Sequence, residues 1–171
     1  MDKPELARRI KVAAYLEGDF VLRSGQRSKY YLDKYLFAAD PEILAELGRR
    51  FAEYATDAEI IAGGELGAVA LVAATAMTCS KPFVIVRKAQ KDYGTGKLIE
   101  GPLVKDKRVL LVEDVGTTAG AALDAAQCLT DAGATVTKIV FAVDRMQGAD
   151  RNVEAAGYAF VALLTRKDLE I

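Results

Sequence analysis

The sequence contains no histidine and only two cysteines among its 171 residues. Without histidine, the chain cannot build imidazole metal sites, Ser-His-Asp triads or an imidazole acid–base catalyst. The two cysteines, Cys79 and Cys128, are too few for a disulfide framework or a cysteine zinc site. Both fall in apolar segments with helical character, so we predict buried free thiols.

The chain also lacks an excess of charge and a long hydrophobic run. Its 23 basic and 24 acidic residues leave a formal net charge of −1, which gives no general indication of a nucleic-acid partner. The longest apolar stretch, Ala68 to Met77, is too short to span a bilayer, and no signal peptide is recognisable. We therefore expect one cytoplasmic domain over residues 1–171, with no nucleic-acid partner and no membrane partner.

Hydrophobic periodicity predicts alternating helices and strands along most of the chain. Helices are predicted over residues 4–16, 41–54, 66–78, 119–132 and 150–156. Strands are predicted over residues 59–62, 83–86, 108–112, 136–143 and 160–164, with a hairpin over 20–33. Gly18 is expected to end the first helix, and the polar residues 88–100 to form a mobile loop. Repeated strand–helix units imply an α/β fold with a parallel sheet covered on both faces, and ligands of such sheets bind beyond the carboxyl ends of the strands.

The most informative segment is Val109–Gly120, in which a buried strand leads into two acids, a loop of small residues and a helix. The acids Glu113 and Asp114 suit ribose hydroxyls or a hydrated Mg²⁺, and the loop lets a phosphate reach backbone N–H groups at a helix N-terminus. An ordinary helix cap is the alternative, but two acids before Gly-Thr-Thr-Ala-Gly favour the phosphate site. The segment is neither a Walker A loop nor a dinucleotide-binding glycine pattern. It resembles the loop of type I phosphoribosyltransferases that binds 5-phosphoribosyl 1-diphosphate (PRPP).

A second segment, residues 87–97, is a cationic loop that directly follows a predicted core strand. Clustered cations there would stabilise the departure of a diphosphate, and its glycines would let the loop move. A charged surface loop without function is the alternative interpretation.

Two further segments carry candidate binding side chains. Arg145 follows a predicted strand and could bind a carboxylate through both guanidinium nitrogens, or form a salt bridge with the neighbouring Asp144. Tyr30 and Tyr31 lie on opposite faces of a predicted strand, so only one of them is expected to line a pocket. Packing in the core is the alternative for this pair.

Taken together, these segments resemble the orotate phosphoribosyltransferases over nearly the whole chain. The hairpin resembles the family's Phe-x-Leu-x-Ser-Gly-x-x-Ser-x-Tyr-Tyr/Phe segment, and the cationic loop resembles its Arg-Lys-x-x-Lys-x-His-Gly pattern. The Asp-Arg-x-x-Gly segment at residues 144–148 separates an orotate enzyme from purine enzymes of this fold. The resemblance implies a type I phosphoribosyltransferase fold, with a mainly parallel central sheet flanked by helices. It also implies a small helix-and-hairpin hood over residues 1–40 and a core over 41–171.

The resemblance further implies that PRPP and orotate react to give orotidine 5′-monophosphate and diphosphate, a step in pyrimidine (UMP) biosynthesis. The implied catalytic residues are Lys91, Glu113 and Asp114. The implied PRPP-binding residues are these three and Arg23, Arg87, Lys88, Tyr93, Val115, Gly116, Thr117, Thr118, Ala119, Gly120 and Ala121. The implied orotate-binding residues are Thr117, Arg145 and Tyr31. The family uses Mg²⁺, for which we predict no direct protein ligand, and forms a homodimer in which loop 88–100 reaches the partner's site.

Four positions differ from the family pattern. Tyr93 replaces a loop histidine and cannot act as an imidazolium, because a tyrosine hydroxyl titrates near pH ~10. Ala121 replaces a hydroxyl residue, Glu113 stands where many members have Asp, and Arg23 stands where a lysine is usual. Two other functions stay open: a phosphoribosyltransferase for another base, and a non-catalytic PRPP-sensing regulator that binds nucleic acid.

Overall fold

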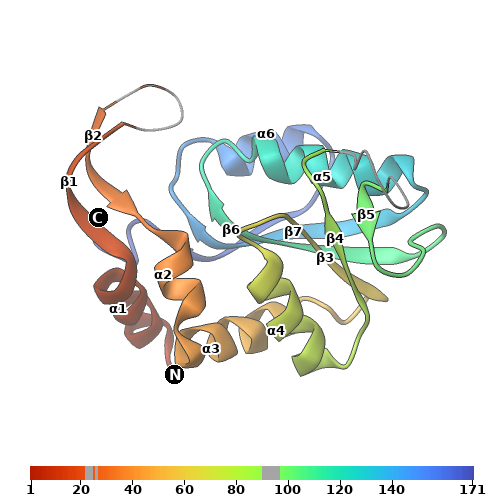
Figure 1. The fold of residues 1–171 in the computed structure, drawn as a ribbon, viewed down its shortest axis with the longest axis horizontal. Coiled ribbons are helices and arrows are strands. Elements are labelled where there is room, and N and C mark those ends of the chain that lie inside the picture. The colour runs from red at the N-terminus through yellow and green to blue at the C-terminus, as the bar shows by residue number, and fades with distance from the viewer. Residues whose placement is uncertain (22–24, 26, 90–96) are drawn as a thin grey trace.

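The centre of the fold is a six-stranded sheet with the strand order β5-β4-β3-β6-β7-β8 (Figure 1). The computed structural model describes residues 1–21, 25, 27–89 and 97–171. The strands are β3 (Ile60–Gly64), β4 (Phe83–Val86), β5 (Ile99–Glu100), β6 (Arg108–Gly116), β7 (Thr135–Asp144) and β8 (Phe160–Thr165). All pair in parallel except β5, which lies antiparallel to β4 at the edge.

Helices cover both faces of this sheet. One face packs against α1 (Lys3–Ala14), α3 (Pro41–Ala52) and α4 (Val69–Cys79), and the other against α5 (Gly120–Asp131) and α6 (Ala149–Ala155). Along β6 the side chains alternate between the two cores: Leu110 and Val112 join the first, Val109 and Leu111 the second. Burial on both faces explains why this strand has a continuous apolar sequence.

The N-terminal hood consists of α1, a hairpin and a short helix. Strands β1 (Tyr15–Val21) and β2 (Arg27–Leu32) pair antiparallel, and α2 (Lys34–Ala39) follows directly. Figure 1 shows the hairpin projecting beside the carboxyl end of β6. The hood therefore lies beside the edge of the sheet where ligands of α/β proteins bind.

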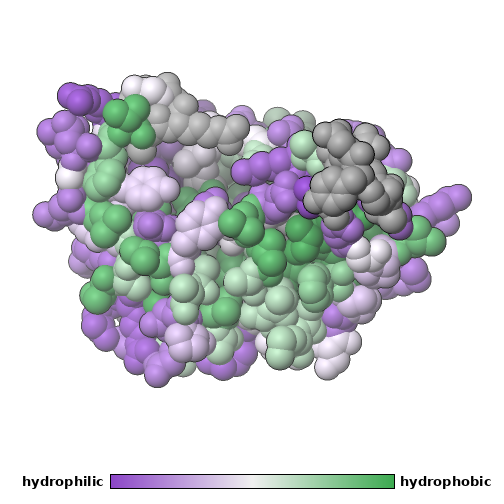
Figure 2. Space-filling view, in the orientation of Figure 1, coloured by the Kyte–Doolittle hydropathy of each residue, from purple (hydrophilic) through white to green (hydrophobic). Residues whose placement is uncertain are grey.

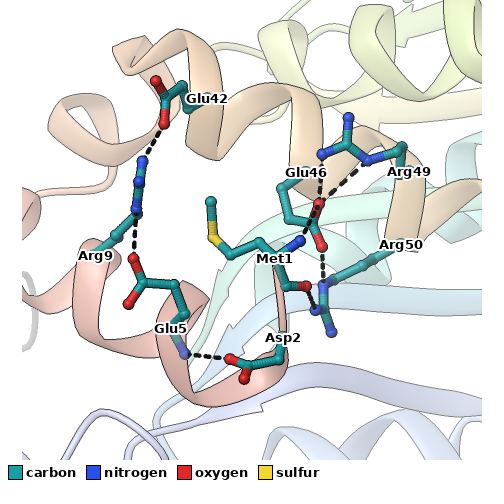
Figure 3. A network of polar contacts seen from close by, with 8 residues as sticks. All are labelled: Met1, Asp2, Glu5, Arg9, Glu42, Glu46, Arg49 and Arg50. Carbon is teal, nitrogen blue, oxygen red and sulfur yellow. Dashed lines mark hydrogen bonds and ion pairs between the residues drawn. The ribbon is translucent and has the colours of Figure 1, made fainter.

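A polar network fastens α1 to α3, as Figure 3 shows. Its centre is the buried carboxylate of Glu46, which contacts the guanidinium groups of Arg49 and Arg50 and the amino group of Met1. Arg9 bridges Glu5 on its own helix and Glu42 on α3. These contacts are structural, and they hold the first helix of the hood on the core.

The predicted order of elements is confirmed, with several corrections. The first helix ends at Ala14, so Gly18 does not terminate it but lies inside β1. Helix α2 and the edge strand β5 were not predicted, since both are too short for a clear hydrophobic period. Strand β6 continues to Gly116, so both acids belong to the strand and not to the loop after it.

The structure also bears on the apolar stretches and the two cysteines of the chain. Within the described ranges, no helix is long and apolar enough to cross a membrane. Cys79 and Cys128 are free thiols, but both are half-buried and not fully buried as predicted.

Candidate active site

The residues singled out in the sequence meet at the carboxyl edge of the sheet. Strands β3, β4, β6 and β7 end there, and the register places Gly116 of β6 opposite Asp144 of β7. The backbone N–H of Arg145 donates to the carbonyl of Gly116 across this pair, at 2.8 Å. Parallel pairing therefore brings the acid pair, the phosphate loop and Arg145 to one place.

The two acids at the end of β6 are nearly inaccessible to solvent. Glu113 is 8% exposed and Asp114 is 2% exposed. Glu113 Oε1 accepts the backbone N–H of Asp114 at 3.1 Å. Desolvation by burial, reinforced by the negative charge of Asp114, raises the pKa of Glu113 to about 8. At neutral pH the pair thus holds a proton on Glu113 and can donate as well as accept hydrogen bonds.

This raised pKa predicts how stability depends on pH. Because the folded-state pKa of Glu113 lies above its unfolded value of 4.5, its contribution is fully present below pH 4.5. That contribution is lost as pH rises through about 8. We expect Glu113→Gln, which cannot ionise, to gain a few kcal/mol of unfolding free energy relative to the wild type between pH 5 and about 9. Urea unfolding across this range measures the difference, and a constant difference would show that Glu113 is already ionised at low pH.

A lysine that the sequence did not single out completes the acid pair. Lys34, the first residue of α2, places its Nζ 2.7 Å from Asp114 Oδ2. Burial alone would lower the pKa of Lys34, but its hydrogen bond to Asp114 raises it. A methyl group at Gly67 would stand 1.7 Å from the same carboxylate oxygen, so glycine is required there. The hood and the loop after β3 therefore both contact Asp114 at the end of β6.

The loop between β6 and α5 has the shape expected of a phosphate cradle. Ala119, directly before α5, adopts a left-handed conformation with φ 64°, and no side chain of a described residue caps the helix. The backbone N–H groups of the first turn, including those of Gly120 and Ala121, thus lack intrahelical partners and can bind an anion. Thr117 is half-buried and Thr118 is exposed, so both hydroxyls belong to the surface of this loop. Asn152 steadies the loop by donating to the carbonyl of Thr118 at 2.9 Å.

Arg145 is buried beside this cradle without a carboxylate partner. It is 7% exposed, its Nη2 donates to the Tyr30 hydroxyl at 3.0 Å, and its Nε has no hydrogen-bond partner among the described residues. The alternative salt bridge with Asp144 is absent from the described part of the chain, since that carboxylate accepts the N–H of Met146. Burying a guanidinium with an unpaired donor costs folding free energy, and a bound anion would offset that cost.

Of the two hairpin tyrosines, Tyr30 is the one that contacts Arg145. Its ring lies under the guanidinium, 5.1 Å from Arg145 Cζ, and stacks on Tyr15 with centroids 5.6 Å apart. Tyr31 points to the other face and packs against Phe20. The orotate-binding role predicted for Tyr31 therefore stays a prediction. The tyrosine that contacts Arg145 is Tyr30.

The beginning of the cationic loop is fixed to the loop after β3. Glu65 Oε1 accepts the backbone N–H of Lys88 at 2.7 Å, and Glu65 Oε2 lies 3.8 Å from Arg87 Nη1. The sequence alone assigned no function to Glu65. Arg23, Lys91 and Tyr93 lie outside the described residues, so their predicted roles stay predictions.

Sequence comparison identifies the family to which the chain belongs. Residues 42–156 match the phosphoribosyl transferase domain. An orotate phosphoribosyltransferase of Natronomonas pharaonis is 45% identical over 152 residues, covering 89% of this chain and 87% of the relative. One from Methanocaldococcus jannaschii is 40% identical over 154 residues, covering 90% of this chain and 88% of the relative.

Solved structures agree with the sequence relatives. Mycobacterium tuberculosis orotate phosphoribosyltransferase with Fe(III) dicitrate superposes with a TM-score of 0.89 at 32% identity, covering all of both chains. The same enzyme in complex with PRPP gives a TM-score of 0.85 at 31% identity, again covering all of both chains. Leishmania donovani adenine phosphoribosyltransferase, at 18% identity and a TM-score of 0.73 over 96% of this chain and 81% of the other, shares the fold.

Proposed function

The chain belongs to the phosphoribosyltransferase family, among the orotate phosphoribosyltransferases, and we propose how its residues transfer the 5-phosphoribosyl group of PRPP to orotate. The products are orotidine 5′-monophosphate and diphosphate, in the pyrimidine pathway. The type I phosphoribosyltransferase fold places the relevant side chains on one edge of a mainly parallel sheet. Both PRPP and the product carry phosphates that do not cross membranes unaided, which supports a cytoplasmic location.

The reaction requires positioning and charge stabilisation more than proton transfer. The deprotonated ring nitrogen of orotate forms a bond to C1 of the ribose, while the bond from C1 to the diphosphate oxygen breaks. The diphosphate leaves with the electron pair of that bond, so no protein base has to remove a proton at this step. A site without histidine is compatible with this chemistry, because oriented donors and cations supply the stabilisation.

We assign the ribose and its 5-phosphate to the end of β6. Glu113 and Asp114 stand near the carboxyl end of β6 and would bind the ribose hydroxyls, with protonated Glu113 able to donate. The open N–H groups at the start of α5, with Thr117 and Thr118, would bind the 5-phosphate. This assignment fixes the sugar and leaves its C1 free for the incoming base.

The buried guanidinium of Arg145 is the feature that favours orotate over other bases. Orotate has a carboxylate, and Arg145 offers a buried guanidinium that lacks a carboxylate partner among the described residues. A purine has no group to neutralise this charge. This argues against a phosphoribosyltransferase for another base.

The departing diphosphate is assigned to the cationic loop. Arg87 and Lys88 stand at its start, and Lys91 is our candidate for stabilising or protonating the leaving group. Retention of these cations, and the formal net charge of −1, argue against a non-catalytic regulator that binds nucleic acid.

Mg²⁺ fits this site as a partner of the substrate. Among the described residues there is no group of three or more acidic or cysteine side chains that could hold a metal by themselves. Asp114 and Glu113 supply oxygen atoms of the kind Mg²⁺ prefers beside the ribose hydroxyls. When bound, Mg²⁺ would neutralise the negative charge of the diphosphate.

An exposed apolar face supports the homodimer we propose. Figure 2 shows hydrophobic side chains gathered over the region of α2, α4 and β4 (Figure 2). The exposed large apolar side chains of these segments and of the loop before α4 include Leu36, Leu66, Met77 (81% exposed) and Phe83. A partner subunit would bury this face, and in our proposal loop 88–100 completes the partner's site.

Subunit mixing tests this arrangement. At an orotate concentration near the wild-type KM, we expect Arg145→Ala and Lys91→Ala homodimers to be almost inactive, whereas heterodimers contain one intact site when the loop is shared. Random mixing should then restore roughly a quarter of wild-type activity. If no activity returns in heterodimers isolated with two different affinity tags, the loop serves its own subunit.

The overall function is tested by the loss of orotate absorbance with PRPP and Mg²⁺. We expect orotate to be consumed with equal amounts of orotidine 5′-monophosphate and diphosphate formed, and no consumption of adenine or hypoxanthine under the same conditions. Consumption of a purine base instead would support the alternative that the protein is a phosphoribosyltransferase for another base. Salt-dependent RNA binding without base consumption would support the regulator.

A further inference from the structure

The carboxylate of Asp114 has no oxygen open to a ligand in this structure. Its side chain is 3% exposed, and Oδ1 accepts the backbone N–H of Val115. Oδ2 contacts the Lys34 ammonium at 2.7 Å and lies against Gly67, where an added Cβ would be 1.7 Å from it. Apart from that ammonium, Oδ2 has no hydrogen-bond donor in the described part of the chain. A ribose hydroxyl can therefore reach Oδ2 only if one of these neighbours moves.

Of the two neighbours, Lys34 is the one that can move. Gly67 contributes main-chain atoms of the loop after β3, which cannot withdraw without moving that loop. The Lys34 side chain is 33% exposed, has a flexible stem and begins a helix of six residues. Asp33 caps this helix by accepting the N–H of Tyr35 through Oδ1, and the Lys34 side chain can move while this cap stays formed.

We propose that Lys34 is a positioning residue that competes with the ribose hydroxyls of PRPP for Asp114. In the free protein its ammonium lies 2.7 Å from Oδ2 and holds the carboxylate in its orientation. Substrate binding requires this contact to break, and a ribose hydroxyl then donates to Oδ2 in place of the ammonium. This inference rests on the proposed function, because it takes the acid pair as the ribose site.

Competition of this kind has a measurable effect on affinity. When a site is available in only a fraction of the molecules, the apparent Kd equals the intrinsic Kd divided by that fraction. A contact formed in about four-fifths to nine-tenths of the molecules thus weakens binding about fivefold to tenfold. If Lys34 only attracted the substrate, replacing it would weaken PRPP binding, because removing a cation near a polyanion lowers affinity. Competition for Asp114 predicts tighter binding instead.

The test is calorimetric titration of the folded protein with PRPP and Mg²⁺, without orotate. We expect Lys34→Met to bind PRPP about fivefold tighter than the wild type, with the KM for PRPP falling in step. Lys29→Met is the matched control, since it removes an exposed lysine of the same hood and should not tighten binding. Lys34→Arg keeps the charge and should stay close to the wild type.

Unchanged or weaker PRPP binding by Lys34→Met would overturn the inference. Failure of the wild type to bind PRPP would instead overturn the proposed function, so the two failures are distinguishable. If Lys34→Met does not fold, Lys34→Gln keeps a polar head group and is titrated in its place, with the same expected direction. Either variant should melt at a lower temperature than the wild type without PRPP and at a similar temperature with saturating PRPP. This result would agree with a contact made only in the free protein.

Discussion

Replacing Arg145 with alanine is expected to raise the KM for orotate by about 100-fold to 1000-fold. The guanidinium is buried beside the cradle, and among the described residues no carboxylate neutralises it. A bound orotate would supply that carboxylate in a site from which water is largely excluded, where a charged hydrogen bond is strong. Steady-state kinetics with each substrate varied in turn measure the effect, and the KM for PRPP should change far less.

Two controls identify the role of the charge in Arg145. Lys at this position keeps the charge but loses the fork of two nitrogens, so Arg145→Lys should recover only part of the orotate affinity. Uracil lacks the carboxylate, so its weak reaction should be nearly the same in wild type and Arg145→Ala. An equal loss of PRPP and orotate affinity would argue that Arg145 shapes the whole site and does not bind the carboxylate.

Replacing Lys91 with alanine is expected to lower kcat by about 100-fold to 1000-fold while the KM for orotate changes little. The physical reason is that charge on the diphosphate develops as the bond to C1 breaks, so a cation there acts mainly in the transition state. Single-turnover measurements with saturating PRPP separate this step from product release.

Lys105→Ala provides the comparison for Lys91, because it removes an exposed lysine between β5 and β6 that has no assigned role. It should keep kcat near the wild-type value. If Lys91→Ala also keeps its turnover, Lys91 is removed from the mechanism. In that case Arg87 and Lys88, at the start of the loop, become the candidates for the leaving group.

The core of the fold was predictable because burial follows periodicity. Strand β6 is apolar on both faces, and the sheet that it occupies is covered on both faces. The end of α1 was not predictable, because Tyr15 and Leu16 continue a helical pattern but pair with Leu32 and Tyr31 across the hairpin. That pairing depends on residues distant in sequence, which local propensity does not contain.

The same distinction separates the predicted and the unpredicted parts of the site. The acid pair and Arg145 could be predicted, since the carboxyl ends of parallel strands always meet at one edge. Lys34 and Glu65 could not, because their roles come from contacts with Asp114 and Lys88 that only the folded chain creates. For the tyrosine pair, alternation along the strand predicted that only one would line a pocket. Tyr31 was assigned to orotate, whereas Tyr30 is the tyrosine that contacts Arg145.

In our proposal, one edge of the sheet binds ribose at the acid pair and the orotate carboxylate at Arg145. A crystal structure of the protein with Mg²⁺, orotate and a non-hydrolysable PRPP analogue tests it most directly. We predict ribose hydroxyls within hydrogen-bond distance of Glu113 and Asp114, the 5-phosphate at the start of α5, and the carboxylate on Arg145. A carboxylate bound away from Arg145, or a phosphate at the acid pair, would contradict the account.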